Sequence, residues 1–284
     1  MSAIVVGKFD ALHLGHRLLV ERAPADRPIR LLGFTGMATE LGWEERLPLV
    51  APDDRPRILA SWAGDRDLAE TLLPFLRVRH LDAAAFIALL RDDLHASALV
   101  VGQDFRCGRG RSAGIAELAP LCAAAGLLLL AVPPLLLDGA AVSSSRIRQA
   151  LEHGDVAQAA TLLGRPHRLC GTVVRGDGRG QALGFPTANL GERANLHPAP
   201  GVYAAQVTGL PGAWRAAVNI GHLPTVGAAR PLTVEAHLPG FAGDLYGRAL
   251  GLDLLARLRD EQRFANLDDL RAQLVRDVAA VASV

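Results

Sequence analysis

The chain has 284 residues, about twice the length of a typical domain, and half of them are apolar, so two separately packed domains are expected. Its 30 Lys and Arg residues nearly balance 29 Asp and Glu, which argues against the net positive field that favours a nucleic-acid backbone or an anionic membrane. Three widely spaced cysteines without a CxxC pair argue against a disulfide framework or a structural zinc site, and they favour a reducing cytoplasm.

The N-terminal half opens on the strand pattern AIVVG rather than on a secretory leader, and the run LLLLAVPPLLL is too short to span a bilayer, so a soluble protein is expected. From residue 3 to about residue 164, short apolar runs alternate with longer amphipathic ones, as in βαβ units around a parallel sheet. The predicted strands cover residues 3–7, 29–34, 97–102 and 127–132, and the predicted helices, each opened by an Asp or Ser cap, cover 53–63, 82–94 and 112–126.

The C-terminal half has a different texture, with short β runs separated by Gly and Pro, which predicts a small antiparallel barrel. Residues 266–282 predict a helix packed on the barrel, with Asn266 and Asp269 at capping-box spacing. Its expected apolar face consists of Leu267, Leu270, Leu274, Val278 and Val281. We therefore expect an α/β Rossmann-like domain over residues 1–164 and a β-barrel domain with a C-terminal helix over residues 165–284.

The motif HLGH, residues 13–16, lies where the first strand ends and a helix begins. Ligands bind at the carboxyl ends of strands in a parallel sheet, so Gly15 would let a phosphate approach the backbone while His13 and His16 donate hydrogen bonds to it. The alternative is that one histidine caps the helix and the other lies on the surface, which is the commoner outcome for an isolated HxGH pattern. A zinc site is weaker still, because no Cys, His or Glu cluster completes it.

A second cluster, VSSSRIRQAL, follows the last strand of the same domain and opens a helix. Ser143, Ser144 and Ser145 offer hydroxyl and backbone N–H donors, and Arg148 is suited to bidentate contact with a phosphate. Alone, a serine cluster is usually only a helix cap. The joint occurrence of HxGH early and Ser–Arg late in one domain favours a phosphate site.

The C-terminal half carries the segment GRGQALGFPTANL and, further on, Glu235 in the middle of the strand pattern LTVEAHL. The sequence PTAN alone is most simply a Pro-containing turn. A glutamate in a strand usually faces solvent. From the residues alone, both readings stay open.

The order and spacing of GKFDALHLGH, VVGQDFRCGRG and VSSSRIRQAL resemble the nucleotidyltransferase half of bacterial bifunctional riboflavin kinase/FMN adenylyltransferases, also called FAD synthetases. The resemblance continues through GFPTAN, PAPGVY, VNIGHLPTV, VEAHLPGF, GDLYG and RLRDEQRF, in the order of the kinase half. It implies that riboflavin and ATP give FMN, that FMN and ATP give FAD, and that Mg²⁺ assists.

For the first half, the resemblance implies that His13 and His16 hold the reacting phosphates and that Arg148 holds the leaving pyrophosphate. This transfer needs no protein nucleophile, because the FMN phosphate itself attacks, so alignment and charge neutralisation carry the catalysis. The residues implied to bind nucleotide or flavin here are Gly7, Lys8, Phe9, Asp10, Gly15, Asp104, Ser143, Ser144 and Ser145.

For the second half, the resemblance implies that the Thr187 hydroxyl and the Asn189 amide oxygen bind Mg²⁺, a hard cation that prefers oxygen ligands. Glu235 would be the general base that accepts the proton of the riboflavin 5′-hydroxyl. The residues implied to bind nucleotide or flavin are Gly178, Gly180, Gly184, Pro186 and Arg259, with Asp177 and Arg179 as loop residues near the nucleotide.

The chain departs from the family pattern in two places. Lys8 and Ala11 stand where the family usually has Asn and Gly, and GFTGMATELGW replaces the common Phe-x-Pro-His-Pro segment. A third phosphate-contacting histidine is therefore in doubt, and Lys8 is expected to supply part of its charge. The variant resembles the plant-plastid and cyanobacterial branch of FAD synthetases.

Two alternatives remain beside the bifunctional enzyme: a riboflavin kinase whose first half is inactive or repurposed, and a flavin-binding module without turnover. An intact Thr187, Asn189 and Glu235 argue against the second, because binding alone needs no base beside a metal site. The expected partners are small-molecule substrates, with no nucleic acid and no membrane, and the sequence leaves a homo-oligomer open.

Overall fold

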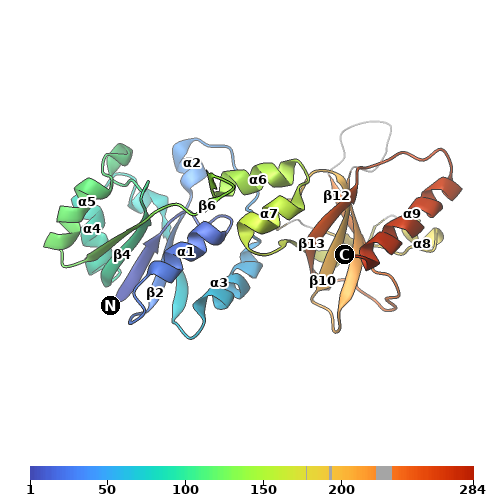
Figure 1. Cartoon of the computed structure of the whole chain (residues 1–284), viewed down its shortest axis with the longest axis horizontal. Helices are drawn as coiled ribbons and strands as arrows, with labels where there is room; N and C mark the ends of the chain where they lie inside the picture. Colours follow the sequence, from blue (N-terminus) through green and yellow to red (C-terminus); the bar gives the residue numbers. More distant parts are fainter. Residues whose placement is uncertain (177, 192–193, 222–231) are drawn as a thin grey trace. The chain divides into compact units, whose positions relative to one another are not determined.

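The computed structural model describes residues 1–176, 178–191, 194–221 and 232–284, coloured along the chain in Figure 1. The chain divides into two compact units. The first comprises Met1–Arg46 and Asp53–Ser143, and the second comprises Leu47–Pro52 and Ser144–Val284. Within the described ranges, no helix is both long and apolar enough to cross a membrane.

The first unit is built on a parallel five-stranded sheet in the order β3-β2-β1-β4-β5. Its strands are β1 (Ser2–Val6), β2 (Ile29–Thr35), β3 (Leu68–Pro74), β4 (Ala96–Gly102) and β5 (Leu128–Val132), followed by the small hairpin β6 (Leu136–Leu137) and β7 (Ala140–Ala141). Its helices are α1 (Leu14–Arg22), α2 (Met37–Leu41), α3 (Arg55–Ala63), α4 (Ala83–Asp92) and α5 (Ile115–Ala124). The chain order reverses between β1 and β4, which are neighbours, and in such sheets ligands bind beside the carboxyl ends of the strands at that point.

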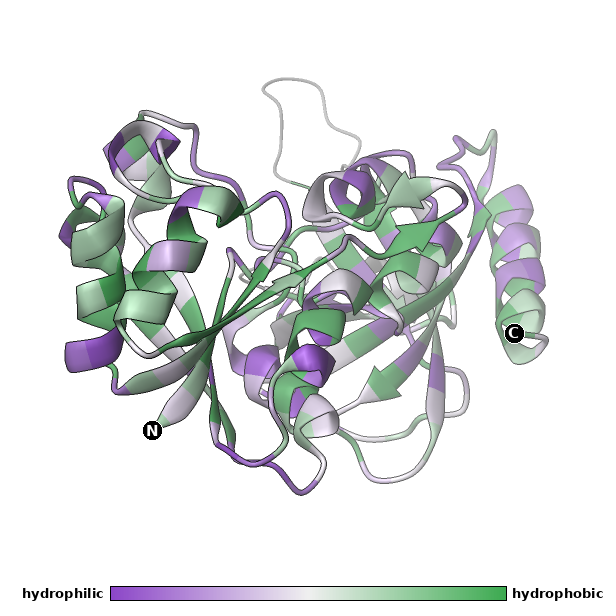
Figure 2. Ribbon diagram, turned by 60° about the vertical axis from the view of Figure 1, so that its left-hand side comes forward, coloured by the Kyte–Doolittle hydropathy of each residue, from purple (hydrophilic) through white to green (hydrophobic). Residues whose placement is uncertain are grey.

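Alternate side chains of the strands divide the apolar core between the two faces of this sheet. Figure 1 shows α4 and α5 side by side on one face, where one cluster joins both helices to the strands, and α1 and α3 on the other face. In Figure 2 the strands of this sheet are green along most of their length. The cluster under α4 and α5 includes Ile4, Val6, Leu32, Phe86, Leu90, Leu99, Leu118 and Cys122.

The predicted Rossmann-like α/β architecture is confirmed, with differences in detail. The sequence analysis missed β3, an edge strand with only one buried residue. It placed the start of α5 too early: the helix begins after Gly114, whose N–H donates to the Glu117 carboxylate, rather than after Ser112. The Asp82 cap of α4 is as predicted, because its side chain accepts from the Ala85 N–H.

The second unit contains a closed six-stranded barrel in the order β10-β11-β12-β9-β8-β13, which confirms the predicted antiparallel barrel. Its strands are β8 (His167–Val174), β9 (Ala188–Leu190), β10 (Gly201–Thr208), β11 (Trp214–Gly221), β12 (Thr233–His237) and β13 (Ala249–Arg259). Its helices are α6 (Ser144–Glu152), α7 (Val156–Leu163), α8 (Arg179–Ala182) and α9 (Leu267–Ala282). The short strand β9 was not predicted.

The helix α9 packs against β10 and β11 of the barrel, as expected. Its cap is Asn266, whose side chain accepts from the Asp269 N–H at 2.8 Å. Val281 is buried on the barrel side, but Leu267 is 66% exposed, so its assignment to the apolar face was wrong. Leu267 is the first residue of the helix, one position after the cap, and at this end of the helix its side chain is exposed to solvent.

The segment Leu47–Pro52 belongs to the second unit although its neighbours on both sides belong to the first. The Leu196 N–H donates to the Pro48 carbonyl at 2.8 Å, and the buried Asn195 amide donates to the Leu49 carbonyl at 3.3 Å. Arg148 of α6 donates to the Leu47 carbonyl with two guanidinium nitrogens, each at 3.2 Å. These backbone carbonyls tie the segment to the barrel unit.

A buried histidine makes the stability of the barrel unit depend on pH. His167 at the start of β8 is 2% exposed, its Nε2 lies 2.7 Å from the Leu196 carbonyl, and burial lowers its pKa to about 4. The unfolded chain, with an ordinary histidine pKa near 6.5, therefore binds more protons between pH 6.5 and pH 4, and stability falls as pH falls through that window.

We expect the free energy of unfolding of this unit to drop by about 2 kcal/mol more between pH 7 and pH 5 in the wild type than in His167→Gln, which keeps a donor but not the titration. Urea unfolding at the two pH values measures the difference. Equal losses in both proteins would show that His167 is not the group responsible.

Candidate functional sites

The turn between β1 and α1, residues 7–16, is called the HLGH turn below. It follows the carboxyl end of β1, next to the end of β4, so it lies at the point where the sheet order reverses. Asp104, exposed, follows β4 at the same edge, where its carboxylate lies over Gly102: a Cβ there would come within 2.8 Å of Asp104 Oδ1. The fold thus brings the HLGH turn and Asp104 to neighbouring strand ends.

His13 caps α1 through its side chain. It is 6% exposed, and its Nδ1 accepts the His16 N–H at 3.2 Å. With Nδ1 as acceptor, the neutral ring carries its proton on Nε2, which can then donate. The capping interpretation is therefore observed for His13, and it does not exclude the donor role.

The rings of His13 and His16 are stacked, with centroids 3.7 Å apart and planes 13° from parallel. Phe9 meets the His16 ring edge-on at 4.9 Å. Gly15 lies close to this stack, because a Cβ at that position would lie 3.1 Å from the His13 ring, a tight contact. The alternative interpretation required the second histidine to lie on the surface, but His16 is half-buried.

The first residues of the turn differ from one another in burial. Phe9 is fully buried and Asp10 half-buried, and a Cβ on Gly7 would come within 3.0 Å of the Phe9 ring. Lys8 is exposed, and its Nζ lies 4.6 Å from the centre of the Trp43 ring. The two departures from the family pattern thus meet, since Trp43 closes the segment that forms α2.

The serine–arginine cluster is divided between the units. Ser143 ends the first unit, whereas Ser144, Ser145 and Arg148 lie in α6 of the second. The Arg148 guanidinium donates to the Leu47 carbonyl. Joint action of Arg148 and the HLGH turn on one ligand stays a prediction.

The second site lies on the outer face of the barrel and is called the barrel site: Thr187, Asn189 and Glu235. Glu235 of β12 is paired with Asn189 of β9, and Thr187, two residues earlier, donates from Oγ1 to Glu235 Oε2 at 3.4 Å. Val234 and Ala236, on either side of Glu235, are buried in the core. Directly opposed residues share a face in an antiparallel sheet, so three oxygen-bearing side chains converge there.

Asn219 of β11 is paired with Glu235 from the other side, and the sequence analysis missed it. It is half-buried in β11, between the buried Val218 and Ile220. The signal was present, because a polar residue at an outward position of WRAAVNI breaks an apolar run. The barrel site therefore has an amide on each side of its carboxylate.

The glycine-rich segment lies against the barrel site. A Cβ on Gly176 would overlap the Asn189 amide, and a Cβ on Gly180 would lie 3.4 Å from Thr187 Oγ1. Gly178 and Gly184 have φ of +71° and +86°, values that favour glycine. Asp177 lies outside the described residues, as does the whole HLPTV part, residues 222–226, of the VNIGHLPTV motif.

Pro186 ties the start of β9 to β12. Its carbonyl oxygen lies 2.8 Å from Nδ1 of His237, and the neighbouring Phe185 ring meets the His237 ring edge-on at 5.3 Å. These contacts hold the turn before Thr187 against the strand that carries Glu235. They place the hydroxyl donor close to the carboxylate.

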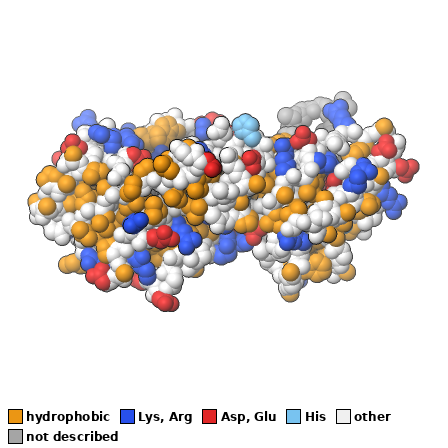
Figure 3. All heavy atoms as spheres, in the orientation of Figure 1, with side chains coloured by type: hydrophobic (Ala, Val, Ile, Leu, Met, Phe, Trp, Pro, Cys, Tyr) orange, Lys and Arg blue, Asp and Glu red, His pale blue; other side chains and the backbone are white. Residues whose placement is uncertain are grey.

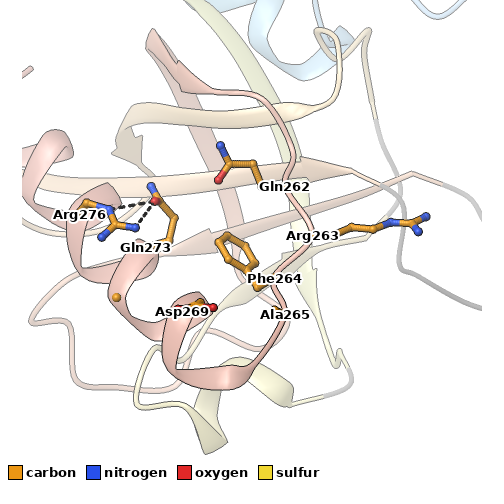
Figure 4. Close-up of a pocket in the computed structure, with 8 residues that line it drawn as sticks. Gln262, Arg263, Phe264, Ala265, Asp269, Gln273 and Arg276 are labelled. Atoms are coloured by element: carbon orange, nitrogen blue, oxygen red, sulfur yellow. Dashed lines mark hydrogen bonds between the residues drawn. The ribbon is translucent and has the colours of Figure 1, made fainter.

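A cavity of about 460 Å³ opens beside α9 in the second unit, and Figure 4 shows Gln262, Phe264 and Gln273 around it. Gln273 of the lining donates to the buried Asp277 carboxylate at 2.8 Å, and Arg259 binds the same carboxylate at 2.9 and 2.7 Å. The cavity is lined by Gln262, Arg263, Phe264, Ala265, Asp269, Ala272, Gln273 and Arg276. Arg259 thus supports the cavity through Asp277, and a direct contact with a ligand stays a prediction.

The loop before this cavity reaches the end of β11. A Cβ on Gly221 would overlap the Glu261 carboxylate, so the loop packs on the strand end two residues from Asn219. Asn219 in turn is paired with Glu235. In the described part of the chain, no three His, Cys, Asp or Glu side chains gather as a metal cluster, so any cation here would depend on hydroxyl and amide oxygens.

Comparisons with known proteins match both halves in order. A family model described as FAD synthetase matches residues 1–146, and one described as riboflavin kinase matches residues 163–284. The bifunctional riboflavin kinase/FMN adenylyltransferase of Escherichia coli (strain K12) is 37% identical over 287 residues, which cover 96% of this chain and 90% of that protein. FAD synthetase 2, chloroplastic, of Arabidopsis thaliana is 37% identical over 220 residues, covering 71% of this chain and 59% of that protein.

Among solved structures, one titled "Crystal Structure of Macrolide-efflux Protein from Streptococcus pneumoniae" matches with a TM-score of 0.88 and 28% identity, covering 100% of this chain and 94% of that one. The activity in that title belongs to that protein, and for this chain the match shows a shared fold. With both domain models matched in order and a 37% identical relative covered over nearly its whole length, this chain belongs to the family of bifunctional riboflavin kinase/FMN adenylyltransferases.

Proposed function

We propose that the chain phosphorylates riboflavin to FMN at the barrel site and adenylylates FMN to FAD at the HLGH turn, with ATP as the donor in both steps. One observation carries the proposal. Thr187, Asn189 and Glu235 converge on the outer face of the barrel, against the glycine-rich segment. That arrangement supplies a base beside oxygen ligands, which a phosphoryl transfer needs and simple flavin binding does not.

In the kinase step, Glu235 accepts the proton of the riboflavin 5′-hydroxyl while that oxygen attacks the γ-phosphorus of ATP. The bond between the γ-phosphorus and the bridging oxygen breaks, and ADP leaves. Mg²⁺, when bound, would neutralise charge on the phosphates. Thr187 and Asn189 fit it because the Thr187 hydroxyl, in donating its proton to Glu235, keeps oxygen lone pairs for a cation, and Asn189 adds an amide oxygen.

The cavity beside α9 is our proposed site for the flavin ring. Its volume of about 460 Å³ lies in the range of small-molecule pockets, and it combines an aromatic face, Phe264, with the amides of Gln262 and Gln273. Such a lining suits a flat ring with a polar edge. Gly178, Gly180, Gly184 and Pro186 would contact the nucleotide from the segment against the barrel site.

In the adenylylation step, an oxygen of the FMN phosphate attacks the α-phosphorus of ATP, the bond to the β-phosphate breaks, and pyrophosphate leaves. His13 Nε2, His16 and the amide-rich start of α1 would stabilise the crowded negative charge. Asp104 lies at the neighbouring strand end for contact with nucleotide or flavin. The Lys8 ammonium, exposed near the turn, would supply charge in place of the missing histidine.

The remaining proposed contacts belong to the same step. Arg148, with Ser143, Ser144 and Ser145, would bind the leaving pyrophosphate, and Gly7, Phe9, Asp10 and Gly15 would shape the turn around the nucleotide. The buried rings and tight glycine contacts of the turn support the second role.

Product analysis tests the whole proposal. Purified protein with riboflavin, Mg²⁺ and ATP should yield FMN and then FAD, separated by chromatography. FMN alone would identify a kinase with an inactive or repurposed first half, and neither product would identify a non-catalytic flavin-binding module. Supplying FMN and ATP directly then isolates the second step.

We also propose small-molecule partners only, a cytoplasmic location and no nucleic-acid or membrane partner. The near balance of charge supports the absence of a nucleic-acid or membrane partner, and on the face drawn in Figure 3 the Lys and Arg side chains are interspersed with Asp and Glu. The three widely spaced cysteines support the cytoplasmic location. A homo-oligomer is compatible with the proposal.

We propose residues 1–164 and 165–284 as the functional division. The kinase model starting at residue 163 supports it, whereas α6 and α7 group with the barrel. A fragment 163–284 should phosphorylate riboflavin alone. A fragment 144–284 should do the same and be more stable by about 3 kcal/mol or more, because it keeps Val156, Ala159 and Leu162 buried between α7 and the barrel.

Thermal melting and FMN production by the two fragments measure this. A shorter fragment that melts cooperatively yet makes no FMN would contradict an independent kinase domain.

A further inference from the structure

The HLGH turn contains backbone that has to be held in place. Phe9 has φ of +48° and Leu12 has φ of +46°, and both side chains are fully buried. A non-glycine residue in this region costs on the order of 1–3 kcal/mol and persists only where its surroundings enforce it. Two such residues within four positions, directly before His13, mark the turn as strained.

One side chain from outside the turn binds its backbone. Arg55, the first residue of α3, donates from Nη1 to the Phe9 carbonyl at 2.9 Å. Its Nε donates to Glu70 Oε2 at 3.0 Å, and its Nη2 donates to the other carboxylate oxygen. Glu70 lies on the edge strand β3, and both side chains are less than one fifth exposed.

The geometry of the ion pair fixes where the Phe9 carbonyl lies. A guanidinium held by two parallel hydrogen bonds to a carboxylate has its remaining donor pointed in one direction, and here that donor meets the carbonyl. The pair is anchored to the start of α3 and to β3, so the carbonyl is tied to two rigid elements of the first unit.

The position of Phe9 is passed on to the histidines. Its ring meets the His16 ring edge-on at 4.9 Å, and His16 is stacked on His13 at 3.7 Å. Loss of the hydrogen bond to the carbonyl would let the strained residue relax, and the ring that packs on His16 would move with it. The histidines would then lose their alignment without losing their own side chains.

We propose that Arg55, paired with Glu70, is a positioning residue of the adenylylation site: it holds the Phe9 carbonyl and thereby sets the orientation of His16 and His13. The inference rests on the proposed function, because FAD formation is one of its readouts. Misplacing a catalytic group by about 1 Å costs roughly a hundredfold in rate, so the effect falls on turnover rather than on substrate binding.

The test compares Arg55→Met with Arg30→Met. Arg30 also forms a bidentate pair, with Asp67 at 2.9 and 2.8 Å, but this pair is more exposed and lies at the amino ends of β2 and β3, away from the HLGH turn. With FMN and ATP, the kcat for FAD formation should fall about a hundredfold in Arg55→Met, with KM values within about threefold, and stay within twofold in Arg30→Met. Riboflavin phosphorylation should stay within twofold in both.

Arg55→Lys and Glu70→Gln guard against loss of folding. Lysine keeps one charged donor for the carbonyl and glutamine keeps a hydrogen-bond acceptor for Arg55, so both variants should retain a kcat several-fold above that of Arg55→Met. If Arg55→Met does not fold, these two variants carry the test, and wild-type kcat in both would overturn the proposal. Wild-type kcat in a folded Arg55→Met would also overturn it, even with a lowered melting temperature, since that outcome is purely structural.

A second readout needs no enzyme activity. The side-chain NMR signals of His13 and His16, assigned with His13→Ala and His16→Ala, should shift in Arg55→Met and stay unchanged in Arg30→Met. Unchanged histidine signals in Arg55→Met would overturn the positioning role. If the wild type makes no FAD, the proposed function fails, while these signals still decide whether Arg55 sets the histidine geometry.

Discussion

Glu235→Gln is expected to lower turnover of riboflavin to FMN by about 10²–10⁴-fold while riboflavin and MgATP still bind. Glutamine keeps the shape and the acceptor oxygen that can receive the Thr187 hydroxyl hydrogen bond, but it cannot accept the proton of the attacking hydroxyl. The change therefore separates binding from chemistry. Steady-state kinetics, with substrate affinities measured by calorimetry, checks both halves of the expectation.

Two controls sharpen this test. Glu152→Gln, an exposed change on α6 of the same unit, should alter neither activity, since solvent-facing substitutions rarely matter. The Glu235→Gln protein supplied with FMN should make FAD at the wild-type rate, because that step is assigned to the other unit. Kinase turnover that survives in Glu235→Gln would remove Glu235 as the base, and a collapse of FAD synthesis from FMN would contradict two separate sites.

His16→Ala is expected to slow FAD formation by about a hundredfold and to leave FMN formation nearly intact. Losing one preorganised donor to a transition-state phosphate costs on the order of 3 kcal/mol. Alanine keeps the backbone N–H that donates to His13 Nδ1 and favours the helix, so α1 should still be capped and formed. Coupled assays of the two products measure the ratio of the effects.

His80→Ala, an exposed histidine of the same unit, is the matched control and should change neither rate. A folded His16→Ala protein that makes FAD at the wild-type rate would leave the HLGH turn with its capping role alone.

Much of the fold could be predicted from the spacing of apolar residues and from the capping, Gly and Pro residues between the elements. The central strands β1 and β4 are apolar along most of their length, and such runs are typical of the centre of a parallel sheet. The edge strand β5 could also be predicted from its apolar sequence, although only Val132 in it is buried. The edge strand β3 was missed because Glu70 and Thr71 interrupt its apolar sequence LAETLLP, whereas the other edge strand, β5, is apolar throughout. The strand β9 was missed because it has three residues, too few for a period to show.

The candidate site residues differ in how far the sequence alone points to them, and the reason is physical. His13, Thr187 and Glu235 stand in motifs whose order along the chain resembles the family, and that resemblance made them candidates. Asn219 joins the barrel site only through the register of β11 against β12. Arg55 looks like an ordinary surface cation at the start of a helix, because its two partners, Phe9 and Glu70, are 46 and 15 residues away.

Because residues 47–52 belong to the second unit, they are synthesised well before the residues that bind them. The Leu49 carbonyl and the Asn195 amide that binds it are 146 residues apart, so at typical rates of protein synthesis Asn195 is made roughly 7–30 s later. Until then the first unit folds while residues 47–52 lack the donors Asn195 and Leu196. A nascent chain arrested before residue 195 should therefore expose Leu47–Pro52 to proteases, while the completed protein protects it.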